Sequence, residues 1–131
     1  MPIKHMELAA PKPLVGHAVD AYVIKTYGHF NKVPLAPKGC LYHGTSLKNL
    51  ESIKTKGILP TDKSADGKPA VYGAQKFSTA SIWSPMTEGV MLRFKTGTQQ
   101  WKKADNKVFY SYNAVLPKNI EVLTADGWQP L

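Results

Sequence analysis

The chain has 131 residues, 43% of them hydrophobic, and its formal net charge is +8. This length allows one compact core and is too short for two ordinary domains. No apolar run approaches the roughly 20 residues that a membrane helix requires, and the first dozen residues lack the apolar stretch of a signal peptide. We therefore expect one domain outside the membrane, with an N-terminal arm and helix over residues 1–39 and a core over residues 40–131.

The positive charge comes almost entirely from lysine, because Arg93 is the only arginine. A basic surface attracts phosphate-rich ligands and acidic proteins without indicating a fold. Because reading of DNA bases depends strongly on the planar fork of arginine, the composition argues against a dedicated DNA-reading module. The single cysteine, Cys40, excludes an internal disulfide and gives no structural zinc pattern. We expect it to be a small buried side chain beside a strand.

Two helices are predicted in the first half of the chain. Apolar residues recur at helical spacing between residues 14 and 30, which predicts an amphipathic helix that ends near Gly28. A proline-containing connector and a short apolar strand over residues 40–43 follow. Thr45 or Ser46 can then cap a second helix, which Gly57 ends as a left-handed residue.

The second half alternates short strands with polar connections. The segment 60–69 predicts a loop, and the segment 95–107 predicts a loop or edge structure. The remaining predicted elements are strands over 70–72, 89–94, 108–112 and 120–123, a short helix over 78–83 and a turn at 116–119. This pattern predicts an α+β fold with a split, mainly antiparallel sheet and two or three short helices.

The strongest local signal for chemistry is His43-Gly44-Thr45, in which a glycine directly follows a strand histidine. A glycine at this point lets a ligand approach the backbone, whose N–H and C=O can bond a carboxamide. The histidine ring can bond a ribose hydroxyl. Nicotinamide in NAD⁺ presents a carboxamide next to a ribose. The alternative reading is a core histidine at the end of a strand, followed by a glycine turn.

The surrounding residues favour the NAD⁺ reading. Leu41-Tyr42-His43-Gly44-Thr45, followed by Ile53 and Gly57-Ile58, resembles the opening motif of the diphtheria-toxin-like transferases, the poly-ADP-ribose polymerases and the RNA 2′-phosphotransferases. Val71-Tyr72-Gly73-Ala74 and the serine-led segment Ser78–Trp83 are similar to the next motif of the polymerases. This resemblance to the ADP-ribosyltransferase superfamily implies a domain that consumes NAD⁺ as a substrate and requires no metal.

The resemblance also implies roles for individual residues. His43, Gly44 and Thr45 would bind NAD⁺, while Tyr72 and Trp83 would enclose the nicotinamide ring. The alternative, that the aromatic residues belong to the core, is more probable for any one of them than for all of them together.

A second register of the aromatic motif stays open. Lys76-Phe77-Ser78-Thr79 also resembles the aromatic-Ser-Thr strand of the diphtheria-like toxins, which would give Phe77 the stacking role with Ser78 beside it. We prefer Tyr72, because the serine-led helix and the strand over residues 90–94 then fall where the family has them.

A catalytic acid is the weakest part of the resemblance. The segment 108–120 resembles the last strands of the family, near whose start a glutamate bonds the nicotinamide ribose and stabilises an oxocarbenium-like transition state. The matching stretch here, Ala104-Asp105-Asn106-Lys107, has no glutamate. Asp105 is our candidate acid, and Asn106 could bond the ribose without acting as a base. The other acids after Tyr72, each also explained as a surface charge, are Glu88, Glu121 and Asp126.

The function implied by the resemblance is mono-ADP-ribosylation, with cleavage of NAD⁺ and transfer of ADP-ribose to a protein or nucleic-acid acceptor. A small basic transferase also resembles the toxic module of a bacterial secreted toxin, which would act in the cytoplasm and pair with an immunity protein. Two alternatives stay open. One is a non-catalytic module that binds NAD⁺, ADP-ribose or nucleic acid, and the other is an RNA 2′-phosphotransferase-like enzyme, for which a single arginine is too few.

Overall fold

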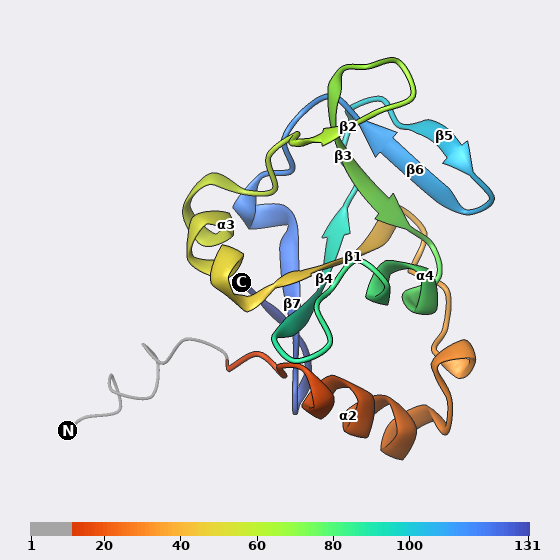
Figure 1. The fold of residues 1–131 in the computed structure, drawn as a ribbon, viewed down its shortest axis with the longest axis vertical. Coiled ribbons are helices and arrows are strands. Elements are labelled where there is room, and N and C mark those ends of the chain that lie inside the picture. Colours follow the sequence, from red (N-terminus) through yellow and green to blue (C-terminus); the bar gives the residue numbers. More distant parts are fainter. Residues whose placement is uncertain (1–11) are drawn as a thin grey trace.

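A computed structural model describes residues 12–131, which form one antiparallel eight-stranded sheet with three α-helices (Figure 1). The strands are β1 (Cys40–Ser46), β2 (Asp62–Lys63), β3 (Pro69–Ala74), β4 (Gly89–Lys95), β5 (Lys102–Asp105), β6 (Val108–Ser111), β7 (Ile120–Thr124) and β8 (Gly127–Pro130). The helices are α2 (His17–Tyr27), α3 (Leu50–Lys56) and α4 (Phe77–Ser81), with 3₁₀ turns η1 (Phe30–Lys32), η2 (Leu47–Asn49) and η3 (Pro117–Asn119). The predicted α+β class is confirmed.

The strands are arranged in the order β5-β6-β3-β1-β4-β7-β8, and β2 pairs with the free part of β3. β1 pairs with β4 along its whole length. In contrast, β1 and β3 pair only where Tyr42 lies opposite Ala74. The two strands therefore diverge beyond this pair, and the sheet opens in its middle.

The side chains of the strands alternate between two apolar clusters on opposite faces of the sheet. One face carries residues such as Leu92 and Phe94 and is covered by Leu50 and Ile53 of α3. The other face carries residues such as Met91 and is covered by α2 and α4. Figure 1 shows α3 on one side of the sheet and α4 on the other. The sheet is thus enclosed from both faces, and its central opening lies between α3 and α4.

Local signals place the helix ends correctly. Gly28 ends α2 at φ 88°, as predicted. The hydroxyl of Ser46 accepts a hydrogen bond from the N–H of Lys48, which caps η2, the 3₁₀ turn that leads into α3. Gly57 ends α3 at φ 80°.

Of three short strands, two differ from the predicted pattern. β2 lies in the segment 60–69, which we predicted as loop, because it pairs with the start of β3. β8 pairs with β7 across a tight turn that the sequence pattern did not indicate. β5 is an edge strand in the segment 95–107, in agreement with the predicted loop or edge structure. All three are exposed or half-buried, so they carry no apolar alternation.

Two other expectations concern the N-terminal part and the cysteine. The irregular arm lies outside the described residues except at its end. Cys40 starts β1 and is half-buried rather than fully enclosed. In residues 12–131, no helix has the length and apolar character that crossing a bilayer requires.

Candidate functional site

A cavity of about 700 Å³ opens where β1 and β3 diverge. Its volume falls within the roughly 300–1,000 Å³ of small-molecule sites. β1 contributes His43, Gly44 and Thr45, β3 contributes Tyr72, and Trp83 closes one side after α4. Five residues that the sequence singled out therefore line one cavity, although they come from three separate segments.

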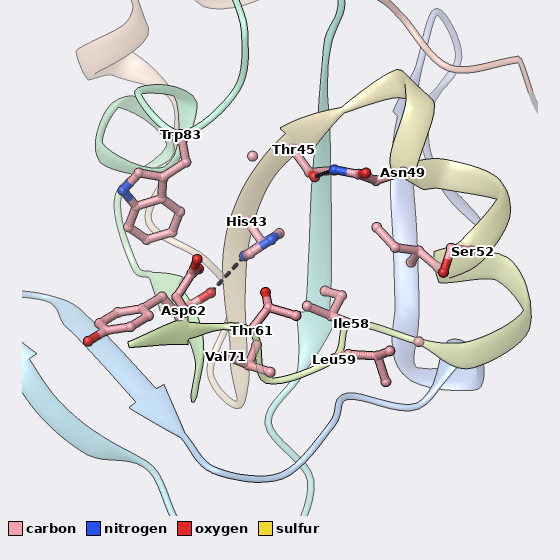
Figure 2. Close-up of a pocket in the computed structure, with 14 residues that line it drawn as sticks. His43, Thr45, Asn49, Ser52, Ile58, Leu59, Thr61, Asp62, Val71 and Trp83 are labelled. Atoms are coloured by element: carbon pink, nitrogen blue, oxygen red, sulfur yellow. Dashed lines mark hydrogen bonds between the residues drawn. The ribbon is translucent and has the colours of Figure 1, made fainter. Parts of the chain in front are cut away.

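His43 bridges the gap between the two diverging strands. Its Nδ1 lies 2.7 Å from the carbonyl oxygen of Tyr72 (Figure 2). Because a carbonyl oxygen only accepts, Nδ1 carries the proton, and in the neutral ring Nε2 is a free acceptor. Burial lowers the pKa of His43, while the bond to Tyr72 and the charge of Asp62 act in the opposite direction with smaller effect. The ring is therefore neutral at pH 7, with its orientation set by the backbone of β3.

Gly44 has a structural reason to be glycine. A Cβ at this position would lie 2.4 Å from the carbonyl oxygen of Ala80 in α4, which is too close for any side chain. The small residue therefore lets α4 pack directly against β1. The same residue lines the cavity beyond the last β1–β3 pair, where the edge of β1 facing β3 is no longer paired with that strand.

The side of the cavity opposite Trp83 is built by α3 and the residues that lead into it. The hydroxyl of Thr45 accepts a hydrogen bond of 3.1 Å from the side-chain amide of Asn49 (Figure 2). Ser52 lines the same side. This wall presents the polar groups of Thr45, Asn49 and Ser52 beside the apolar Ile53, and these polar groups suit a sugar or phosphate better than an aromatic ring.

The aromatic wall consists of Tyr72 and Trp83. The rings of His43 and Trp83 lie 5.9 Å apart between centroids. Trp83 is 36% exposed, which is unusual for so large an apolar side chain and leaves part of its ring free to contact a ligand. Figure 2 shows Trp83 and Asp62 on one side of His43, with Asn49 and Ser52 on the other.

Phe77 and Ser78, the residues of the alternative register, do not line the cavity. Phe77 is 2% exposed and packs in the core, with its ring 5.4 Å from that of Tyr42. The carbonyl of Ser78 accepts a hydrogen bond from the hydroxyl of Ser81 within the α4 turn. Phe77 therefore belongs to the core, whereas Tyr72 lines the cavity.

The structure places Asp105 away from the cavity and Asp62 in it. Asp105 is exposed at the end of edge strand β5, where its carboxylate accepts a hydrogen bond from the N–H of Asn106. Asp62 lies on β2, and it was missed because it falls in a polar stretch without periodicity. The available signal was its position in the segment that joins the two motifs, and this segment also contributes Leu59 and Thr61 to the lining.

The other charged residues considered above do not line the cavity. Glu88 accepts a hydrogen bond of 2.7 Å from the hydroxyl of Ser46. Arg93 forms an ion pair with Glu121 at 2.6 Å and lies 4.8 Å from the ring centroid of Trp128. Asp126 lies in the β7–β8 turn, where its N–H donates to the hydroxyl of Thr124. The arginine that a phosphate site would use is therefore engaged outside the cavity.

Comparison with known proteins assigns neither a family nor a function to the chain. No protein-family model matches the sequence, and no curated protein matches it either. In residues 12–131, no group of three or more histidine, cysteine or acidic side chains is placed to hold a metal ion.

Proposed function

We propose that the chain is a mono-ADP-ribosyltransferase that uses NAD⁺ as its donor. The observation that carries this proposal is the convergence of His43, Gly44, Thr45, Tyr72 and Trp83 on one cavity at the opening of the sheet. Two motifs with similar order in the ADP-ribosyltransferase superfamily thus meet in space. The cavity has both an aromatic wall and a polar wall, as a ligand with a nicotinamide ring and ribose groups requires.

In this proposal, NAD⁺ enters with nicotinamide between Tyr72 and Trp83. The backbone of Gly44 bonds the carboxamide, and the free Nε2 of His43 accepts a hydrogen bond from a ribose hydroxyl. Thr45 and its partner Asn49 lie on the side where the rest of the dinucleotide would extend. The neutral state of His43 supports this role, because a protonated ring would offer no acceptor.

The reaction breaks the bond between C1′ of the ribose and N1 of nicotinamide. The electron pair of this bond stays on nicotinamide, which leaves as a neutral base, and a nucleophile of the acceptor bonds C1′ and releases its proton. We assign Asp62 the role that the sequence suggested for Asp105. Its carboxylate would stabilise positive charge on the ribose and take up the proton of the nucleophile.

The test uses NAD⁺ labelled on its adenylate, whose label reports transfer of ADP-ribose, and measures the released nicotinamide by chromatography, with and without RNA, DNA and protein fractions of a bacterial lysate. We expect Asp62→Asn to lower turnover by about 10²–10³-fold while NAD⁺ binding persists, since a lost transition-state contact acts mainly on kcat. His43→Ala should weaken NAD⁺ binding as well. Asp126→Asn, at an exposed turn, serves as the matched control for loss of one carboxylate.

Each outcome of this test has a definite meaning. Loss of turnover in Asp105→Asn with full activity in Asp62→Asn would return the catalytic role to Asp105. Tight binding of NAD⁺ without nicotinamide release in any fraction would contradict the proposal and identify a binding module. Removal of an RNA 2′-phosphate, with the phosphate recovered on ADP-ribose and no ADP-ribose retained on the macromolecule, would favour the phosphotransferase alternative.

A further inference from the structure

A row of tyrosine and lysine side chains leads from the cavity to the edge of the sheet. Tyr72 of β3 lies opposite Tyr110 of β6, and Tyr110 lies opposite Lys102 of β5. Paired residues of antiparallel strands project from the same face, so these three side chains form a line across the sheet. Tyr112 follows β6, and Lys68 precedes β3. We call these five residues the tyrosine–lysine face.

The rings of this face lie close together. The centroids of Tyr72 and Tyr110 are 5.4 Å apart, and those of Tyr110 and Tyr112 are 5.9 Å apart. The ammonium groups of Lys68 and Lys102 lie 5.4 Å and 5.0 Å from the centroid of Tyr112. Tyr110 is buried, whereas Tyr72 and Tyr112 are half-buried and both lysines are exposed. Aromatic surface and positive charge therefore coincide at Tyr112.

Asp66 holds this arrangement in place. Its carboxylate accepts hydrogen bonds from the hydroxyls of Tyr112 and Tyr110, the latter at 3.3 Å, and lies 3.4 Å from the ammonium of Lys102. These contacts join the loop between β2 and β3 to the β5–β6 hairpin, which lie together at the top of Figure 1. β2, which leads into this loop, carries Asp62 into the cavity. The face is thus fixed before any partner binds.

We propose that the tyrosine–lysine face binds single-stranded nucleic acid. Bases stack on exposed aromatic rings without regard to sequence, and neighbouring ammonium groups neutralise the phosphates of the strand. Tyr112 offers its half-buried ring, while Lys68 and Lys102, whose ammonium groups lie beside that ring, offer the charges. The formal charge of +8 assists the approach of such a polyanion.

The composition of the face favours a single strand over other partners. A duplex hides its base faces, so it could use the lysines but not the ring of Tyr112. An acidic protein would also use the charges without requiring aromatic stacking. Tyr72 belongs both to this face and to the cavity, so a bound strand would extend toward the site of NAD⁺ cleavage.

The role of the strand as acceptor rests on the proposed function. A ring N–H or a hydroxyl of the nucleotide nearest the cavity would bond C1′ of the ribose, nicotinamide would leave with the bonding electron pair, and the proton of the nucleophile would pass to Asp62. Binding of the strand itself does not depend on NAD⁺. Binding of the strand and its role as the acceptor can therefore be disproved separately.

The test measures fluorescence anisotropy of labelled 20-nucleotide oligo(dT) and oligo(U) with the full chain in the absence of NAD⁺. Tyr112→Leu, which removes the ring, should raise Kd about tenfold with an unchanged salt slope. Tyr112→Phe keeps the ring and loses the hydrogen bonds that the hydroxyl makes with Asp66 and Lys102, so its affinity should stay near that of the wild type. Lys102→Ala should weaken binding and reduce the slope of log Kd against log salt by about 0.7, as loss of one single-strand phosphate contact does.

Matched controls separate a defined site from diffuse attraction. Lys25→Ala removes the same charge from α2, away from the face, and should change affinity much less than Lys102→Ala. Equal weakening by the two lysine variants would overturn the proposal. A blunt-ended duplex or a poly-glutamate chain that binds as tightly as the single strands at equal salt would also overturn it. Strand binding without nicotinamide release would instead disprove the transferase alone, and release without strand binding would disprove this face alone.

Discussion

Among the single residues, His43 is held in one orientation and one protonation state. Burial lowers its pKa, and the carbonyl of Tyr72 fixes the proton on Nδ1. The residue that would contact the ribose is therefore an acceptor over the neutral range of pH. The orientation and the protonation state of His43 both depend on the carbonyl of Tyr72 in β3, so the β1 motif alone does not determine them.

The lowered pKa of His43 makes stability depend on pH in a defined direction. In the unfolded chain the ring titrates near its ordinary value of about 6.5. As pH falls below this value, the unfolded state binds a proton that the folded state does not, so the free energy of unfolding decreases until pH reaches the folded pKa. Above about 6.5 the contribution of this residue is constant. Urea unfolding between about pH 7.5 and 5 should show this slope, and His43→Phe should remove part of it.

An NMR titration checks the same point directly. The ring signal that disappears in the His43→Phe variant should have a midpoint below the ordinary value of about 6.5. A midpoint at or above that value would contradict both the lowering of the pKa by burial and the role of His43 as an acceptor over the neutral range of pH.

Phe77 and Trp83 provide a second comparison between residues, because one is in the core and the other faces the cavity. Phe77→Ala should lower the free energy of unfolding by about 3–5 kcal/mol, as expected for loss of a fully buried aromatic ring. Trp83→Ala should cost far less stability and abolish most NAD⁺ binding. Chemical denaturation and calorimetric titration with NAD⁺ measure the two effects. The reverse pattern would favour the register in which Phe77 stacks on nicotinamide.

Among the secondary-structure elements, the end of α3 supports the cavity through Gly57. This residue has φ 80°, and a Cβ on it would lie 2.0 Å from the carbonyl oxygen of Val115. Next to it, Ile58 and Val115 form an isolated antiparallel bridge. The glycine thus lets the chain turn and at the same time contact the segment that leads to η3.

Gly67 provides a matched control for Gly57, because its φ is 81° and a Cβ on it would meet no other atom within 4 Å. Gly67→Ala should lower the free energy of unfolding only by the backbone strain, about 1–2 kcal/mol. Gly57→Ala should cost about 1–3 kcal/mol more, because the backbone of Val115 must move. Free energies of unfolding from urea titrations measure both. Equal costs would show that the contact with Val115 relaxes without penalty.

Over the molecule as a whole, one sheet links the two apolar clusters. Val71 belongs to the cluster under α3, and Val23 of α2 belongs to the cluster on the opposite face. Because both clusters share β1, β3 and β4, neither can lose its packing while the sheet stays intact. The N-terminal helix is thus part of the folded unit rather than an appendage.

We therefore expect a single unfolding transition for residues 12–131. Val23→Ala and Val71→Ala should each lower its free energy by about 2 kcal/mol, the combined effect of two lost methyl groups and a cavity. Tryptophan fluorescence and far-UV circular dichroism should give coincident curves in both variants. Two separated transitions in the Val23→Ala protein would show that α2 unfolds independently.

Local patterns along the chain were enough to predict the α+β class, the end of α2 at Gly28 and the end of α3 at Gly57. They also singled out residues that line the opening of the sheet, among them His43, Gly44 and Tyr72. These features depend on apolar periodicity and on backbone conformations that glycine alone adopts readily, and both are local properties of the chain.

Only the tertiary structure showed which side chains line the cavity together. Asp62 rather than Asp105 lies in the cavity with His43, and Phe77 belongs to the core. The reason is that β2, β5 and β8 carry no apolar alternation, so their positions follow from which neighbour they pair with. The order of strands in a sheet depends on contacts between distant segments, so a local pattern along the chain does not predict it.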